Sequence, residues 1–230
     1  MSGTPLNALV FGAGGQIGAA CRRTLQQQGY TVTGTGRVAR EDVGIIAFDP
    51  LAGDSLPGTQ AFDAVVWAQG ANVNDSLTDF DADRHLNLYK ANTLFVAESL
   101  HQLLAEQRLH RGARLCVVSS VWQRVARRQK LSYMMSKAAL QGLVMSAAID
   151  LAEQGMLINA VLPGALDTPM THANLSAEQI ARIAAMTPFG RLASIDDVAN
   201  VVGFLCAPAN TSITGQFIAV DLGFENARIV

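Results

Sequence analysis

The chain has 230 residues, of which half are hydrophobic and 16% are charged, with a formal net charge of −2 at pH 7. This length suits one α/β domain with a large core. The slightly acidic balance argues against nucleic-acid binding, which usually needs a basic footprint. No apolar run approaches the roughly 20 residues of a membrane-spanning helix, and residues 1–15 lack the features of a signal peptide. We therefore expect a protein that binds neither nucleic acid nor membrane, and three widely spaced cysteines, which favour free thiols over disulfides, indicate a cytoplasmic setting.

Short β-rich apolar runs alternate with longer helical stretches. The strand candidates are 6–11, 30–36, 43–48, 62–68, 113–119, 156–162 and 216–220, and the helix candidates are 16–28, 82–108, 132–154, 176–186 and 195–207. This alternation predicts a doubly wound parallel sheet, a Rossmann fold, in a single domain over residues 1–230. Only about a dozen residues separate the second strand from the end of the third, so the helix between them is expected to be shortened or absent.

A glycine-rich turn, FGAGGQIG (11–18), follows the first strand. A strand, a glycine turn and a helix that begins near Gln16 expose backbone N–H groups to a pyrophosphate. No Lys-Ser or Lys-Thr follows, which argues against a phosphate loop of the NTPase kind. A tight turn without a ligand is the alternative. The turn predicts dinucleotide binding, with contacts from Gly12, Gly14, Gly15, Gln16, Ile17 and Gly18.

The end of the second strand reads Thr35-Gly36-Arg37, without the acidic residue that usually binds the ribose of NAD. A guanidinium there can pair with a 2′-phosphate, so Arg37 predicts NADP(H) over NAD(H), a solvated arginine being the alternative. Asp49 and Pro50, which end the third strand, are candidate contacts for the adenine amine, unless they form a plain turn.

Four polar residues are candidates for the chemistry. Tyr133 and Lys137 lie one helical turn apart, and a neighbouring ammonium lowers the pKa of a phenol and suits it to acid/base work. Ser120 ends a central strand, at the sheet edge where α/β proteins bind ligands. Asn92 interrupts an apolar helical row and needs hydrogen-bond partners if buried. A solvated pair and a structural asparagine are the alternatives.

In their order and spacing, these features resemble the short-chain dehydrogenase/reductase family over essentially the whole chain. The segments 158–170 and 214–223 match it as well. The resemblance implies that Tyr133 donates or accepts the substrate proton and that Ser120 holds the substrate oxygen. It implies that Lys137 lowers the tyrosine pKa and binds the nicotinamide ribose, and that Asn92 supports a water-linked proton path. Further cofactor contacts are implied for Ala68, Gln69, Gly70, Pro163, Gly164, Leu166 and Thr168.

The chain departs from the family pattern at two strand ends. Phe11 stands where the family usually has threonine, and Trp67 begins the segment WAQG where it usually has Asn-Asn-Ala-Gly. In the family, the threonine and an asparagine help to tie the first and fourth strands together. We expect an aromatic contact between Phe11 and Trp67 to replace that tie.

The substrate side is expected to include Ser120, Trp122 and Tyr133, with residues 166–190 as a variable loop whose short helix acts as a lid. The apolar side chains of Met170, Met186 and Phe189 favour an apolar pocket. A basic cluster lies between Ser120 and Tyr133, at Arg124, Arg127, Arg128 and Lys130. It can attract an anionic thioester, the alternative being a solvated loop.

These observations predict an NADP(H)-dependent oxidoreductase that moves a hydride between nicotinamide and a carbonyl or secondary alcohol, with Tyr133 as general acid/base and no metal. Two alternatives remain: a non-catalytic dinucleotide sensor on the same fold, and a 3-oxoacyl-thioester reductase. Helices 82–108 and 132–154 carry apolar faces that need covering, and family members pair these helices, so a homodimer or homotetramer is expected. Cys21, Cys116 and Cys206 are expected to be buried free thiols.

Overall fold

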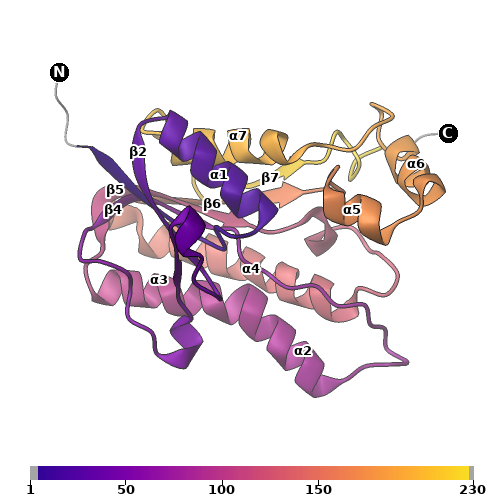
Figure 1. Ribbon diagram of the computed structural model, residues 1–230, viewed down its shortest axis with the longest axis horizontal. Helices are drawn as coiled ribbons and strands as arrows, with labels where there is room; N and C mark the ends of the chain where they lie inside the picture. Colours follow the sequence, from indigo (N-terminus) through magenta and orange to yellow (C-terminus); the bar gives the residue numbers. More distant parts are fainter. Residues whose placement is uncertain (1–4, 228–230) are drawn as a thin grey trace.

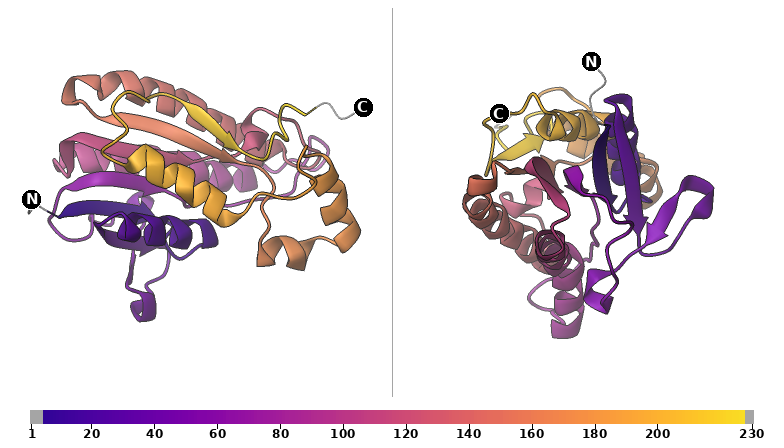
Figure 2. Two further views of the ribbon diagram at one scale, coloured as in Figure 1. Left: turned by 90° about the horizontal axis from the view of Figure 1, so that it is seen from above. Right: turned by 90° about the vertical axis from the view of Figure 1, so that its left-hand side faces the viewer.

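The computed structural model describes residues 5–227, apart from the side chains of residues 170 and 174. Seven parallel strands form one sheet in the order β3-β2-β1-β4-β5-β6-β7 (Figures 1 and 2). The strands are β1 (Leu6–Phe11), β2 (Tyr30–Gly36), β3 (Ile45–Ala47), β4 (Phe62–Trp67), β5 (Leu109–Val118), β6 (Leu157–Pro163) and β7 (Phe217–Val220). The order reverses between β1 and β4, and such a switch point is where open α/β sheets bind ligands. The predicted doubly wound fold is confirmed.

Helices cover both faces of this sheet. The α-helices of the described chain are α1 (Gln16–Gln27), α2 (Ala82–Tyr89), α3 (Phe95–Ala105), α4 (Leu131–Asp150), α5 (Pro169–Asn174), α6 (Ala177–Ala185) and α7 (Ile195–Cys206). Helices α1 and α7 lie on one face, and α2, α3 and α4 lie on the other (Figure 1). Strand β1 is apolar on both sides because Leu9 and Phe11 join the core under α3 and α4, while Ala8 and Val10 join the core under α1 and α7.

The predicted helix 82–108 contains a π-helical turn and ends at Ala105. Helix α2 ends at Tyr89, a π-helical turn spans Lys90–Leu94, and α3 begins at Phe95. The buried row Leu88, Asn92, Val96 and Leu100 runs through this turn. Turns of this kind often occur at functional sites, and this one contains Asn92. The following strand, β5, begins at Leu109 instead of residue 113.

The crossover between β2 and β3 contains one 3-10 turn, Glu41–Val43, which confirms the expected loss of a helix there. Arg22 from α1 extends into the space beside this turn and donates a hydrogen bond of 2.5 Å from Nη1 to the carbonyl of Val43. The long aliphatic stem of an arginine can cover apolar surface while its charged end stays accessible to water. Arg22 thus ties helix α1 to this crossover.

All three cysteines are buried and free, as expected. Among the described helices, none combines the length and the apolar character needed to cross a membrane.

Candidate active site

The glycine turn between β1 and α1 closes against the end of β4. Gly12 has φ +74°, and a Cβ there would lie 2.5 Å from the backbone nitrogen of Gln69, so a side chain is excluded on two counts. Gly14 and Gly15 are exposed, and a Cβ on either would meet only ordinary contacts. Helix α1 begins at Gln16 with no side-chain cap and no acidic residue in its first turn. Its free N–H groups therefore fit an anion such as a pyrophosphate.

The end of β2 presents a free cation. Arg37 is exposed and forms no hydrogen bond or ion pair with residues 5–227, whereas nearby Arg40 pairs with Asp42 at 3.2 Å. Asp49, at the end of β3, caps the next turn, because its Oδ1 accepts from the backbone N–H of Leu51 at 2.9 Å. Pro50 is the buried first residue of that turn. Asp49 therefore caps a plain turn, whereas the Arg37 side chain has no partner within residues 5–227.

The segment after β4 brings the glycine turn close to the polar residues. Ala68 donates its backbone N–H to the carbonyl of Phe11 at 3.0 Å, and the buried Oε1 of Gln69 has no partner among the described residues. A Cβ on Gly70 would lie 3.2 Å from Oδ1 of Asn92 and 3.6 Å from Nζ of Lys137. The backbone at Gly70 thus links the expected dinucleotide site to the expected catalytic residues.

Asn92 is buried and fully bonded. Its Oδ1 accepts from the backbone N–H of Ala71 at 2.7 Å, and its Nδ2 donates to the carbonyl of Ala71 at 3.1 Å and to Oγ of Ser136 at 2.9 Å. Asn92 thereby joins the π turn, the segment after β4 and helix α4. Sequence reasoning missed Ser136, although its place one residue before Lys137 was the available signal.

Ser120, Tyr133 and Lys137 come together at the carboxyl end of β5. Ser120 follows that strand and is hydrogen-bonded to Tyr133. Lys137 donates from Nζ to the carbonyl of Val118 at 3.1 Å, and its Nζ lies 5.9 Å from the centroid of the Tyr133 ring. One turn of α4 therefore presents the phenol and the ammonium to the same sheet edge.

Burial dominates the electrostatics of this pair. It raises the pKa of Tyr133, and the hydrogen bond with Ser120 and the charge of Arg127 oppose it. It also lowers the pKa of Lys137 to about 8. For the chain by itself, desolvation of the buried phenolate outweighs these favourable interactions, so the net direction of the Tyr133 pKa is upward, and the lowering expected from Lys137 stays a prediction.

The ends of β6 and the following segment form the remaining part of the predicted site. Pro163 ends β6, and Gly164 donates its N–H to the carbonyl of Val220 at 3.1 Å. Thr168 caps α5 by accepting from the N–H of Thr171 at 3.0 Å. The carbonyl of Leu166 accepts from Oγ1 of Thr171 at 2.7 Å. These contacts hold the segment at the same sheet edge as Ser120.

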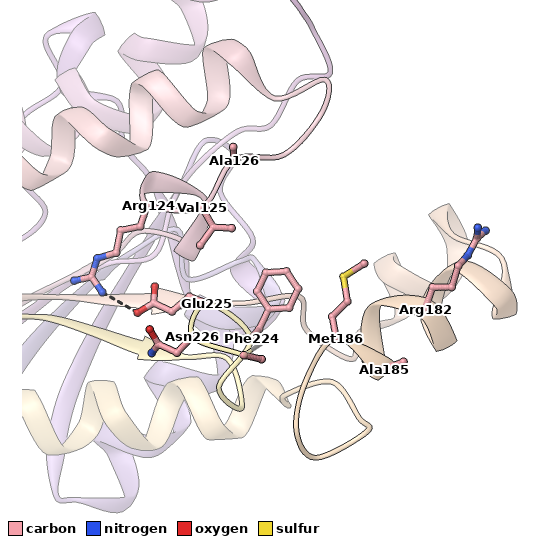
Figure 3. Close-up of a pocket in the computed structure, with 10 residues that line it drawn as sticks. Arg124, Val125, Ala126, Arg182, Ala185, Met186, Phe224, Glu225 and Asn226 are labelled. Carbon is pink, nitrogen blue, oxygen red and sulfur yellow. Dashed lines mark hydrogen bonds and ion pairs between the residues drawn. The ribbon is translucent and has the colours of Figure 1, made fainter. Parts of the chain in front are cut away.

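An open cavity of about 1020 Å³ lies between the segment after Ser120, helix α6 and the residues after β7 (Figure 3). Its lining includes Val125, Met186 and Phe224, and Phe224 contacts Trp122 edge to face at 5.3 Å. Residues 166–190 carry two helices, α5 and α6, where one was expected. Of the apolar residues named there, Met186 lines the cavity, Phe189 is 66% exposed, and the side chain of Met170 lies outside the described residues.

Most of the basic cluster is held by protein partners. Arg124 pairs with Glu225 at 2.9 Å (Figure 3), and Arg127 lies over the ring of Trp122 at 5.2 Å. Lys130 is buried and hydrogen-bonded to the segment after β4. Arg127 and Arg128 are both exposed and form no hydrogen bond or ion pair with the described residues, and the contact of Arg127 is with the Trp122 ring. The solvated-loop interpretation is therefore wrong for Lys130, whose partners were not evident from the sequence.

Comparison with known proteins agrees with this geometry. A family model described as enoyl-(acyl carrier protein) reductase matches residues 53–225. The cis-4-hydroxycyclohexanecarboxylate dehydrogenase of Sinomonas cyclohexanicum is 31% identical, over 94% of this chain and 95% of its own. The chain belongs to the short-chain dehydrogenase/reductase family. It is therefore an oxidoreductase of a family that acts on CH–OH and C=O groups.

Two further relatives are informative. The 3-oxoacyl-(acyl-carrier-protein) reductase FabG of Escherichia coli (strain K12) is 30% identical, over 94% of this chain and 96% of its own. The structure of a gluconate 5-dehydrogenase from Burkholderia cenocepacia J2315 in complex with NADP and tartrate superposes with a TM-score of 0.82 at 23% identity, covering 97% of this chain and 96% of that one. This second likeness concerns the fold.

Proposed function

We propose that this oxidoreductase uses NADP(H) to interconvert a carbonyl and a secondary alcohol, with Tyr133 as the general acid/base. The observation that carries the proposal is the convergence of Ser120, Tyr133 and Lys137 at one sheet edge, with the Lys137 ammonium next to Gly70. The exposed backbone at Gly14 and Gly15 and the uncapped first turn of helix α1 fit a dinucleotide. A non-catalytic sensor would have no need of a phenol, a serine and a buried ammonium in this arrangement.

Each residue has a distinct task in this proposal. NADPH, when bound at the glycine turn, supplies the hydride. Ser120 and Tyr133 hold the substrate oxygen by hydrogen bonds, and the Tyr133 hydroxyl gives its proton to that oxygen as the carbon is reduced. Lys137 favours the phenolate that remains. Asn92 keeps the backbone at Ala71 in place, and the exposed Arg37 pairs with the 2′-phosphate.

A panel of ketones, aldehydes and secondary alcohols tests this function, with NADPH or NADP⁺ and NADH or NAD⁺ measured side by side. We expect turnover of at least one pair, with a higher kcat/KM for the phosphorylated cofactor. Preference for NADH would contradict the role of Arg37. Turnover that is equal in the Tyr133→Phe enzyme would contradict the acid/base role.

A 3-oxoacyl thioester is a second candidate substrate. It is favoured by the identity with the FabG reductase. Arg124 is neutralised by Glu225 and Lys130 is buried, which leaves Arg127 and Arg128 as the exposed positive charges of the cluster that could attract an anionic carrier. Adding acetoacetyl-CoA to the panel distinguishes a simple carbonyl substrate from a 3-oxoacyl thioester. A kcat/KM for acetoacetyl-CoA well above that for simple ketones is expected only for a thioester reductase.

We further propose that the enzyme is a homodimer or homotetramer in the cytoplasm. Helices α2 and α4 share one face of the molecule (Figure 1) and carry exposed apolar side chains. Among these, Leu86 is 52% exposed, Met145 53% and Ile149 77%. Sedimentation velocity of the wild type and of Ile149→Glu tests this, with the variant expected to shift toward smaller species.

A further inference from the structure

Lys130 is a second lysine beside the catalytic tyrosine. It lies at the N-cap of α4, three residues before Tyr133, and its residue surface is only 7% exposed. Its Nζ lies 5.9 Å from the centroid of the Tyr133 ring, the same distance as Nζ of Lys137. Two ammonium groups, those of Lys130 and Lys137, therefore lie equally close to the Tyr133 ring.

All three donors of the Lys130 ammonium are used. Nζ donates to Oδ1 of Asn72 at 2.7 Å, to Oδ1 of Asn74 at 2.5 Å and to the carbonyl of Val73 at 3.4 Å. These acceptors are neutral, and Lys130 forms no ion pair with any residue of the described chain. Its charge is therefore held in place without being neutralised by direct contact.

The segment that accepts these bonds is anchored at both ends. Ala71 is bound by Asn92, and Asp75 accepts from the N–H of Ser132 at 3.0 Å through Oδ1 and from the N–H of Leu131 at 3.3 Å through its carbonyl. Residues 71–75 thus form a strap from the π turn to the first turn of α4. Lys130 binds the middle of this strap.

A buried ammonium is costly to keep charged. Burial and the charge of Arg127 lower the pKa of Lys130, and Asp75 opposes them. A neutral glutamine could bridge the strap with less desolvation cost, so a structural tether alone does not require a cation here. What a cation adds is an electrostatic field at the phenol.

We propose that Lys130 is a positioning residue of the active site: it holds residues 72–74 beside Tyr133 and, through its charge, favours the phenolate form that the reaction produces. This deepens the proposed function and rests on Tyr133 as the acid/base. Other groups also act on the phenol, namely Ser120 after β5, Arg127 before α4 and Lys137 on α4, while Asp75 acts on Lys130 itself. The contribution of Lys130 must therefore be isolated by substitution.

The pKa of Tyr133 can be measured without turnover. The chain has three tyrosines, so 3,5-difluorotyrosine labelling gives few ¹⁹F resonances, and ring fluorination brings phenol ionisation toward neutral pH. The Tyr133 resonance is the one absent from Tyr133→Phe. We expect the pKa from its pH titration to be higher in Lys130→Gln and Lys130→Met than in the wild type, and unchanged in Lys130→Arg.

Arg128→Gln is the matched control, because it removes one positive charge from the same segment at an exposed side chain. It should leave the Tyr133 titration unchanged. If folded Lys130→Gln gave the same Tyr133 pKa as the wild type, the proposal would be overturned and Lys130 would serve only to hold the strap in place. If Lys130→Met does not fold, Lys130→Gln and Lys130→Arg still test the proposal. Both keep hydrogen-bond donors that can hold residues 72–74.

The pH dependence of alcohol oxidation gives the second readout. Oxidation needs the phenolate, so kcat/KM falls on the acidic side of the Tyr133 pKa, and Lys130→Gln should move this limb to higher pH. On that limb we expect a roughly 3- to 10-fold loss in kcat/KM. A raised ¹⁹F pKa without any alcohol turnover would contradict the proposed function alone. Normal turnover with an unmoved limb and an unmoved ¹⁹F pKa would contradict the role of Lys130 alone.

Discussion

Phe11 and Trp67 stack at the ends of β1 and β4, with ring centroids 5.7 Å apart and an angle of 22° between the rings. Phe48 and Phe95 pack against Phe11 at 5.4 Å and 5.6 Å, and Nε1 of Trp67 donates to Oγ of Ser99 at 2.8 Å. The aromatic contact expected from the sequence is confirmed. It joins the two strands on either side of the switch point, directly before the glycine turn and Gln69.

This stacking should be energetically coupled. A double-mutant cycle with Phe11→Leu and Trp67→Leu should give a coupling free energy of about 0.5–1.5 kcal/mol in urea unfolding. Phe62 provides the control, since it lies at the opposite end of β4, and the cycle of Phe11→Leu with Phe62→Leu should be additive. Additivity in both cycles would show that the Phe11–Trp67 pair contributes burial only.

Two glycines of the same turn should respond differently to alanine. Gly12→Ala forces φ +74° on a side chain and brings Cβ to 2.5 Å from the backbone of Gln69, so it should destabilise the fold by several kcal/mol, on the order of 3. Gly14→Ala meets only Ile45 at 3.4 Å and should fold normally while binding NADPH more weakly. Thermal melts and fluorescence titration measure the two effects. Normal NADPH affinity in Gly14→Ala would argue against pyrophosphate at this turn.

Arg37→Ala should separate the two cofactors. Loss of a charge-assisted bond to the 2′-phosphate should weaken NADPH binding about 10- to 100-fold and leave NADH binding unchanged. Arg128→Ala, also an exposed arginine, is the control and should change neither. An equal loss for NADPH and NADH would mean that Arg37 does not recognise the phosphate.

Lys137 should impose a pH dependence on stability. Its folded pKa is about 8 against a usual 10.5, so between these pH values the unfolded chain holds a proton that the native chain has lost. The free energy of unfolding therefore rises with pH across this window, by about 3 kcal/mol in total. Lys137→Met lacks this contribution, so the wild type should gain stability relative to the variant from pH 8 to 10.5. A constant difference in chemical unfolding would mean that Lys137 is not desolvated as the structure has it.

Hydrophobic periodicity and the positions of turn residues were sufficient to predict most of the fold from the sequence. The strands from Leu6 to Phe11 and from Tyr30 to Gly36 were predicted to the residue, because apolar runs bounded by glycines and polar residues define buried parallel strands. The π turn at Lys90–Leu94 was not predictable. Its sequence continues a helical pattern, and the extra residue is stabilised by the tertiary bonds of Asn92.

The candidate site was predictable in its residues but not in its electrostatics. Motif order placed Ser120, Tyr133 and Lys137 together. The direction of the Tyr133 pKa depends on burial by distant segments, which local sequence does not encode. The partners of Lys130 lie 56 to 58 residues away, so its role inside the strap required the folded chain.

The most direct test of the central claim is Tyr133→Phe, assayed for turnover and for NADPH binding in the same preparation. The account predicts a fall in kcat of at least about 100-fold, the usual contribution of a positioned general acid, with an NADPH Kd within about twofold of the wild type. Near wild-type kcat in a folded, NADPH-binding Tyr133→Phe enzyme would contradict it.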